Sequence, residues 1–207
     1  MGNIIELAEK RSAIYGLLAL IYRQELKVEI VNELKKPEFI QVLEEFGFSL
    51  NEKFVAQSAK KTVQELSLEY TRLFIGPGKH IPPYESVNRK EEGLLWGKST
   101  VTVKKLIEFL GLNYREGFLN IPDHISVEFE FMQKLVNRER EAREQNDKKT
   151  LSNCLEFEKK FIDEHFSQWI PVFCEKVVTE SNDLFYGQIA KLTEKFIEFE
   201  KTLYKAE

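Results

Sequence analysis

Hydrophobic residues recur along the first third of this chain at the three- and four-residue spacing of amphipathic α-helices. These stripes cover residues 4–21, 28–34, 37–46 and 51–74. Pro37 suits the start of the third stripe, and Gly47 suits its end. Residues 51–74 predict one long helix. No sustained alternation of apolar and polar residues interrupts this pattern, so we expect helices and no sheet.

A loop rich in proline and glycine follows the long stripe. Gly76-Pro-Gly78 breaks the helical pattern, and Pro82-Pro83 favours an extended chain because proline lacks an amide hydrogen and restricts the residue before it. We therefore expect a loop at residues 76–87. Helical stripes resume beyond it and cover residues 94–110, 122–137, 151–166, 171–178 and 184–204. The mixed charges of residues 137–149 predict a solvated helix end and a connection.

The whole pattern predicts an all-α fold. With no low-complexity linker and no repeat, residues 1–207 are expected to form a single-domain helical bundle of roughly eight to ten helices. A chain of 207 residues is long enough for one sizeable core.

Composition narrows the range of functions. The net charge of -4 argues against nucleic acid, which requires a concentrated basic surface. No apolar run approaches the ~20 residues that span a bilayer, and acidic residues interrupt the apolar N-terminal stretch, so a secretory signal is not expected. We predict a soluble, cytoplasmic protein. Cys154 and Cys174 are expected to be reduced and buried.

The sequence lacks the usual parts of a catalytic or metal centre. Gly97-Lys98-Ser99 resembles the end of a phosphate-binding loop, but Glu92 stands where that motif needs a glycine. His124 and Glu128 share one helix face and are expected to pair with each other rather than bind a metal. His80 and His165 are expected at the surface or at helix ends. We predict no enzyme, no catalytic residue, no cofactor and no metal.

The loop and the helix start at Pro122 carry the residues most suited to binding a peptide. The aromatic, aliphatic and proline side chains of this candidate site offer an apolar surface, and its acids, histidine and serine offer polar contacts. The alternative is that the aromatics belong to the core and the acids cap helices. The candidate residues are Tyr70, Leu73, Phe74, Pro83, Tyr84, Glu85, Ser86, Trp96, Asp123, His124 and Glu128.

At these residues the chain resembles the TorD/DmsD/NarJ family of redox-enzyme maturation chaperones. Three motifs carry the resemblance, in the order that they have in the family, and they span roughly residues 65–175. The first is a Tyr-x-x-Leu-Phe helix end followed by Gly-Pro and Pro-Pro-Tyr-Glu-Ser, here Tyr70 to Ser86. The second is Pro-Asp-His-Ile with a glutamate four residues after the histidine, here Pro122 to Glu128. The third is His-x-x-x-Trp-x-Pro, here His165 to Pro171.

The resemblance implies an all-helical cytoplasmic chaperone. Such proteins bind the twin-arginine signal peptide, or another part, of a molybdopterin-containing oxidoreductase subunit, assist insertion of its cofactor and delay its export. The family's peptide site carries over to Leu73, Phe74, Pro83, Tyr84, Asp123 and His124. Asn88 departs from the family pattern, in which an aromatic residue often follows this segment.

The chemistry of the candidate site agrees with that implication. Arginines of a leader peptide need carboxylates, which Glu85, Asp123 or Glu128 could supply. An apolar run needs an aromatic groove. One alternative is a NarJ-type assembly factor for a respiratory complex that is not exported. Another is a nucleotide-hydrolysing enzyme. The loop at residues 76–87 could also act as a hinge, which allows either a monomer or a domain-swapped dimer.

Overall fold

The structure, a computed structural model, describes residues 2–45, 50, 52–112, 121–181 and 185–204. Within these ranges the chain forms helices and one isolated β-bridge, and no strand occurs. The predicted all-α class is confirmed. The α-helices are α1 (Gly2–Arg23), α2 (Val28–Leu34), α3 (Pro37–Glu45), α4 (Glu52–Ala56), α5 (Ala59–Tyr70), α6 (Glu85–Asn88), α7 (Lys98–Phe109), α8 (Ile125–Glu144), α9 (Lys148–Phe161), α10 (Ser167–Ser181) and α11 (Phe185–Leu203).

Two π-helical turns extend α5 and α9. They are η1 (Thr71–Ile75) and η2 (Ile162–Phe166). Wide turns of this kind are rare and occur often at functional sites. Each carries part of a motif singled out above, because η1 holds Leu73 and Phe74 and η2 holds His165.

The chain divides into two compact units. Unit 1 contains residues 1–23, 83–169 and 200–207, and unit 2 contains residues 24–82 and 170–199. The boundaries fall within α10 and near the end of α11. That the whole chain acts as one domain stays a prediction.

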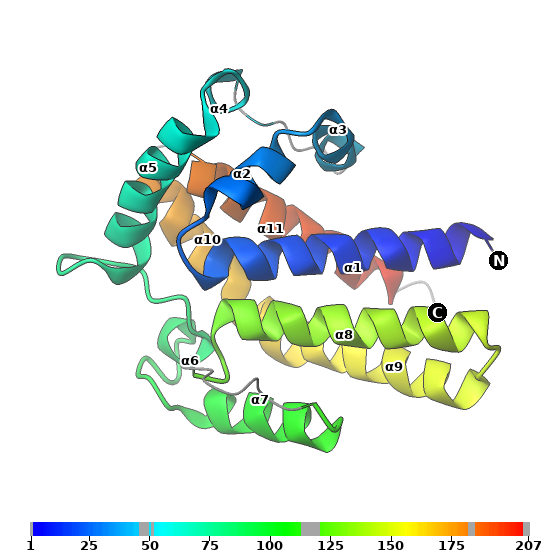
Figure 1. Ribbon diagram of the computed structural model, residues 1–207. Helices are drawn as coiled ribbons and strands as arrows, with labels where there is room; N and C mark the ends of the chain where they lie inside the picture. Colours follow the sequence, from blue (N-terminus) through cyan, green and yellow to red (C-terminus); the bar gives the residue numbers. More distant parts are fainter. Residues whose placement is uncertain (1, 46–49, 51, 113–120, 182–184, 205–207) are drawn as a thin grey trace. The chain divides into compact units, whose positions relative to one another are not determined.

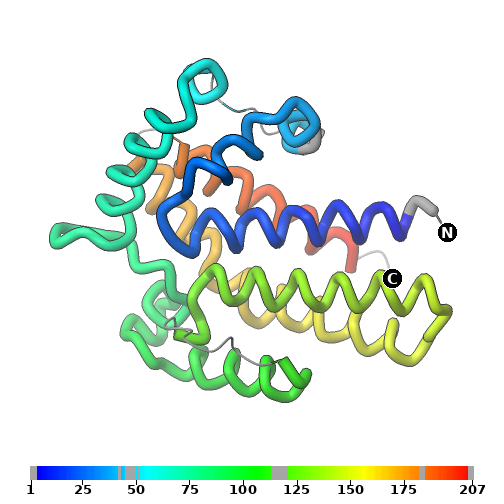
Figure 2. The backbone as a smooth tube through the Cα atoms, in the orientation of Figure 1, coloured from blue at the N-terminus to red at the C-terminus, as the bar shows by residue number. Residues whose placement is uncertain are grey.

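In unit 1, α1 packs along α8, and α8 packs against α9 (Figures 1 and 2). Asp147 ends the short connection between α8 and α9 and caps α9 by accepting a hydrogen bond from the Thr150 amide. Stacked and tilted rings fill the core: Phe129 lies 5.1 Å from Phe166 and 6.2 Å from Tyr15, centroid to centroid. The apolar stripe of α1 and the aromatic residues of α8 and η2 thus form one interior.

A single buried arginine binds three helices to α1. The guanidinium of Arg11 donates to Glu139 at 2.6 Å, to Glu158 at 2.6 Å and to Glu200 at 2.7 Å. These carboxylates come from α8, α9 and α11, and all are buried. Tyr204 also accepts from Arg11 at 2.6 Å. Because one planar group donates to all three acids, removal of Arg11 would leave three buried carboxyl groups without their shared cation.

In unit 2, the predicted helix at residues 51–74 is wrong in one respect, because the chain breaks at Ser58. Ser58 is extended and its hydroxyl accepts from the Lys61 amide, which caps α5 and separates it from α4. α2 packs on α5 and on α3. Tyr70 and Phe74 contact Tyr186 of α11 at 5.7 and 5.5 Å between ring centroids.

The predicted helix at residues 94–110 begins later than expected. Gly93 and Trp96 have φ angles of 71° and 63°, so the chain turns before α7 starts at Lys98. Glu92 fixes this start by accepting from the amide and the hydroxyl of Ser99. Leu94 and Leu95 contributed to the apolar stripe but lie exposed in the turn.

Other boundaries moved by a few residues. The Pro/Gly-rich loop ends sooner than predicted, because α6 begins at Glu85. The stripe at 171–178 belongs to a helix that starts at Ser167 and contains Pro171. The predicted stop at Gly47 and start at Leu184 lie outside the described residues.

Arg11→Met should lower the free energy of unfolding by about 3–5 kcal/mol, because it leaves buried carboxylates without their shared cation. Arg23→Met is the matched control on the same helix: Arg23 pairs with Glu130, and both side chains are about 30% exposed, so its loss should be below about 1 kcal/mol. Chemical denaturation of both variants measures the difference. Equal losses would contradict a special role for Arg11.

Candidate functional site

Residues 83–86, the end of the first motif, lie beside the second motif in unit 1. Tyr84 and His124 form an isolated antiparallel bridge. The Glu85 amide donates to the Asp123 carbonyl at 3.0 Å, and the Ile125 amide donates to the Pro83 carbonyl at 2.9 Å. Two segments separated by about forty residues in the sequence are therefore joined through their backbones.

Asp123 and His124 each have a defined structural role. The Asp123 carboxylate accepts from the Ser86 amide at 2.8 Å, so it caps α6 and not its own helix. His124 is the N-cap of α8 and accepts from the Ser126 amide through Nδ1 at 3.1 Å. Burial, and then the charge of Arg23, lowers the pKa of His124 to about 3. His124 is thus a neutral acceptor at physiological pH.

Glu85 lies at the centre of the site and meets two other chain segments. Its Oε2 accepts from Nδ1 of His165 at 2.8 Å, and its Oε1 accepts from the Arg89 guanidinium at 2.5 Å. Glu85 has no exposed surface. We expected a leader arginine to supply a guanidinium to this carboxylate. In the structure, Arg89 of the same chain supplies it.

Glu128 is the second buried carboxyl that connects motifs. The Trp169 indole donates to its Oε2 at 3.1 Å. Burial raises the pKa of Glu128 well above its usual range, and the nearby charges of Glu85 and Asp123 raise it further. Burial and the two neighbouring acids therefore favour the protonated form of Glu128 in the folded protein.

The parts of the three motifs that belong to unit 1, residues 83–86, 122–128 and 165–169, therefore meet. The third motif supplies His165 to Glu85 of the first and Trp169 to Glu128 of the second. The expectation that His165 lies at the surface or a helix end is wrong for its exposure, since it is 2% exposed and stacks on Phe161 at 4.6 Å. The sequence signal for this role of His165 was its place in the third motif, four residues before Trp169. Arg89 had no comparable signal.

The candidate residues differ greatly in exposure. Tyr84 is partly exposed, and its ring meets His124 edge-on at 5.0 Å. Trp96 is 66% exposed. The other candidates of unit 1 are buried, namely Pro83, Glu85, Ser86, Asp123, His124 and Glu128. In unit 2, Tyr70, Leu73 and Phe74 are core residues, as the alternative interpretation of the aromatics held.

A groove lies on the other side of the helix end that carries Leu73 and Phe74. Its volume is about 970 Å³, and it runs along α5 within unit 2. The lining residues are Glu25, Val63, Gln64, Ser67, Leu68, Thr71, Arg72 and residues 76–79. The first part of the Pro/Gly-rich loop thus borders an open surface even though Leu73 and Phe74 point into the core.

Within the described ranges, no three histidine, cysteine or acidic residues are grouped as metal ligands would be. Among the same residues, no helix combines the length and the apolar character needed to cross a bilayer. Cys154 and Cys174 are buried and unbonded.

Comparison with known proteins agrees with these motifs. A family model described as nitrate reductase delta subunit matches residues 26–175. The chain belongs to this family, which includes the TorD and NarJ chaperones. The resemblance inferred from the three motifs is thereby confirmed.

Individual relatives point the same way. The chaperone protein TorD of Photobacterium profundum is 25% identical over 97% of this chain and 96% of its own length. TorD of Vibrio parahaemolyticus is 24% identical over 93% of each chain. A solved structure assigned as a redox enzyme maturation protein from Archaeoglobus fulgidus is 27% identical, with a TM-score of 0.54 over 91% of this chain and 93% of that one. The chain is a maturation chaperone rather than an enzyme.

Two isosteric changes at the buried carboxyls should differ in their effect on the free energy of unfolding. Glu128→Gln should change the free energy of unfolding by less than about 1 kcal/mol at about pH 4, where the carboxyl is protonated in the folded protein and a neutral amide replaces it. Glu85→Gln should lose about 2–3 kcal/mol, because Arg89 and His165 lose a charged acceptor. Chemical denaturation tests both variants.

The pH dependence of the free energy of unfolding gives a second test of Glu128. Folding raises the pKa of Glu128. Its contribution to the free energy of unfolding is therefore fully present below the pKa of the unfolded chain, and it is lost as pH rises through the pKa of the folded protein. Glu128→Gln should therefore gain stability relative to the unchanged protein as pH rises from about 5 to about 8. A constant difference across this interval would show that Glu128 is ionised in the folded state.

Proposed function

We propose that this chain is a cytoplasmic chaperone for a molybdopterin-containing oxidoreductase subunit. It binds the twin-arginine leader of that subunit, its apo form, or both, and so assists cofactor insertion and delays export. The observation that carries the proposal is the meeting of all three motifs at Glu85 and Glu128. The TorD relatives are named chaperones, and the solved relative is titled a redox enzyme maturation protein, which supports a redox enzyme as the client.

Exposed apolar residues in unit 1 suit the apolar run of a leader. Leu94, Leu95 and Trp96 are 75%, 48% and 66% exposed, and they follow one another in a turn. Tyr84 offers a partly exposed ring in the same unit. Large apolar side chains displayed in this way are typical of an interaction site. That Tyr70, Leu73 and Phe74 take part in the same groove remains a prediction.

The buried acids fit a supporting role better than direct contact. Glu85 and Asp123 already accept hydrogen bonds from within the chain, and Glu128 accepts one from Trp169. None of the three has more than a trace of exposed surface. We therefore assign them to holding the Tyr84 segment in place, so that a client meets a preorganised surface.

One observation favours a second candidate function. The matching family model is described by a nitrate reductase subunit, which suits a NarJ-type assembly factor for a respiratory complex that is not exported. The two functions differ in the client: only the first requires an Arg-Arg leader. Capture of the natural client from native cells, followed by mass spectrometry of its N-terminus, separates them.

Tyr84→Ala and Trp96→Ala should each weaken leader binding by about 1–3 kcal/mol if these residues are interface anchors. Isothermal titration calorimetry should use the leader peptide of the oxidoreductase encoded beside this chain, together with a version in which its Arg-Arg is replaced by Gln-Gln. The replaced peptide should bind more weakly.

Phe109→Ala is the matched control for this measurement. Phe109 is an exposed aromatic of the same unit, at 74%, but it contacts Phe157 and lies outside the candidate site. It should leave the affinity unchanged. If all three alanine variants bind the leader like the unchanged protein, the peptide does not dock on this surface.

A further inference from the structure

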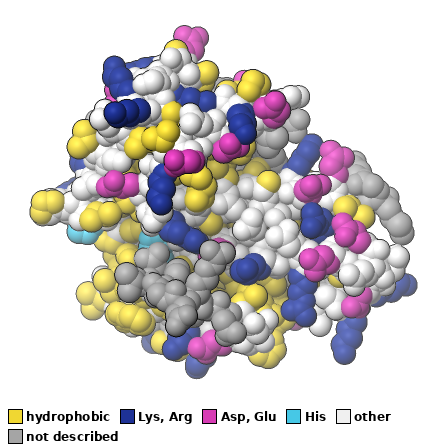
Figure 3. Space-filling model, in the orientation of Figure 1, with side chains coloured by type: hydrophobic (Ala, Val, Ile, Leu, Met, Phe, Trp, Pro, Cys, Tyr) yellow, Lys and Arg dark blue, Asp and Glu magenta, His cyan; other side chains and the backbone are white. Residues whose placement is uncertain are grey.

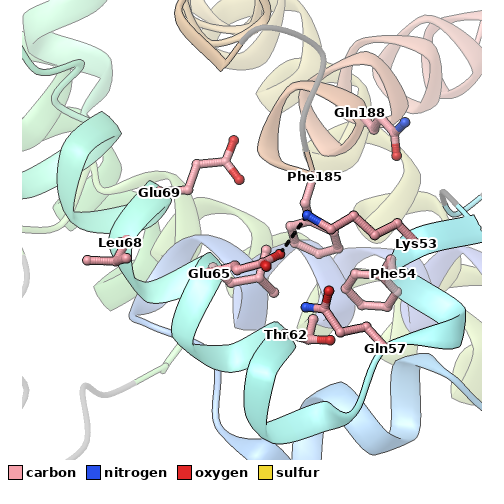
Figure 4. A pocket seen from close by; sticks show the side chains of 10 residues that line it. Lys53, Phe54, Gln57, Thr62, Glu65, Leu68, Glu69, Phe185 and Gln188 are labelled. Carbon is pink, nitrogen blue, oxygen red and sulfur yellow. Dashed lines mark ion pairs between the residues drawn. The ribbon is translucent and has the colours of Figure 1, made fainter.

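A second pocket lies entirely within unit 2, beside α5. Its volume is about 310 Å³, and α4, α5 and the start of α11 supply its walls (Figure 4). The lining residues are Lys53, Phe54, Gln57, Thr62, Glu65, Leu66, Leu68, Glu69, Phe185 and Gln188. On the face shown in Figure 3, hydrophobic side chains lie among charged ones over α4 and α5.

The apolar part of the pocket is aromatic. Phe54 and Phe185 stack with ring centroids 5.1 Å apart and an interplanar angle of 7°. The ammonium of Lys35 lies 5.2 Å from the centroid of Phe54, so this ring already contacts a cation. Leu68 is 75% exposed and offers further apolar surface. An aliphatic stem would find contacts along this wall.

Two acids and one lysine line the pocket, and the ammonium of Lys35 contacts its aromatic wall. Lys53 reaches Glu65 at 3.2 Å, as the dashed line in Figure 4 shows, so these two charges offset each other. Glu69 comes from the next turn of α5 and is 8% exposed. No second lysine or arginine lines the pocket to balance Glu69.

One oxygen of Glu69 lacks a partner. The Tyr186 amide, at the start of α11, donates to the carboxylate, but Oε1 finds no hydrogen-bond donor among the residues that the structure describes. A buried carboxylate oxygen without a donor lowers stability, and a ligand that brings an N–H group would remove that penalty.

We propose that this pocket binds the arginine or lysine side chain of a polypeptide. The stem would lie against Leu66 and the Phe54–Phe185 stack, and the cationic head would donate to Oε1 of Glu69. A neutral apolar side chain would leave that oxygen unpaired, and an anion would be repelled by the Glu69 carboxylate. In taking a protein client as the source of the side chain, the proposal rests on the proposed function.

A small probe tests the pocket without a client. N-acetyl-arginine amide should shift the NMR signals of the Gln57 and Gln188 side-chain amides in a saturable way. N-acetyl-citrulline amide has nearly the same shape without the charge and should bind about tenfold more weakly. Glu69→Gln should weaken the arginine probe by about tenfold for the same reason.

Glu180→Gln is the matched control, because Glu180 is a surface acid of unit 2 that does not line the pocket. It should leave probe binding unchanged. Thermal unfolding of Glu69→Gln confirms that the variant is folded, since glutamine can still accept from the Tyr186 amide. If the two probes bind equally, or if Glu69→Gln binds the arginine probe as the unchanged protein does, the proposal is overturned.

The pH dependence of probe binding is a further check. Burial raises the pKa of Glu69 to about 7, although the charge of Arg72 on η1 and the Tyr186 amide oppose the shift. The other charged groups at the pocket are the Lys53–Glu65 pair and Lys35, whose ammonium contacts the Phe54 ring and donates to Thr62. Because the cation needs the ionised carboxylate, affinity for the arginine probe should rise about tenfold from pH 6 to pH 8. Glu69→Gln should abolish the rise.

Leader binding by the same variants separates this proposal from the proposed function. If the leader binds normally to Glu69→Gln and the arginine probe shifts no pocket signal, the pocket proposal fails and the chaperone function stands. If the arginine probe binds as expected but no leader or client subunit binds, the pocket proposal stands and the proposed function fails.

Discussion

The burial of three carboxyl groups in one small region is the constraint on which the rest of unit 1 depends. Glu85, Asp123 and Glu128 are all fully buried, and a buried acid needs a partner or a proton. Arg89 and His165 serve Glu85, the Ser86 amide serves Asp123, and Trp169 together with a retained proton serves Glu128. The acids come from the first two motifs, and their partners come from the first motif, from the third and from Arg89, so the region forms only when the three motifs are together.

The arrangement explains why polar residues occupy a place where apolar ones would stabilise the fold more simply. Replacing buried ionic groups with apolar side chains is often neutral or stabilising, so stability alone does not require them. Directional bonds, in contrast, fix the position of each segment. They hold the Tyr84 backbone against His124. A chaperone that recognises an extended client gains affinity from such a preorganised surface, because less order must be imposed on binding.

Much of the fold follows from hydrophobic spacing, because helices α1, α2, α8 and α11 depend on local periodicity. Spacing failed where a single side chain decided the outcome: Ser58 caps α5 and breaks the long stripe, and Glu92 delays α7 to Lys98. The motifs identified segments that lie together in unit 1. The sequence could not predict that these acids are buried, since the bond between Glu85 and His165 joins residues eighty positions apart. No local pattern predicts that a carboxylate will lie in the interior.

Hydrogen–deuterium exchange of the chain with and without its client's leader peptide tests the central claim most directly. The claim is that the three motifs together hold one client-binding surface around Tyr84 and Trp96. The account predicts that the leader slows exchange at residues 84–96 and 121–128, where the backbone is either exposed or bonded across the motif junction. Exchange that is unchanged in both segments while the leader is bound, or protection confined to other parts of the chain, would contradict it.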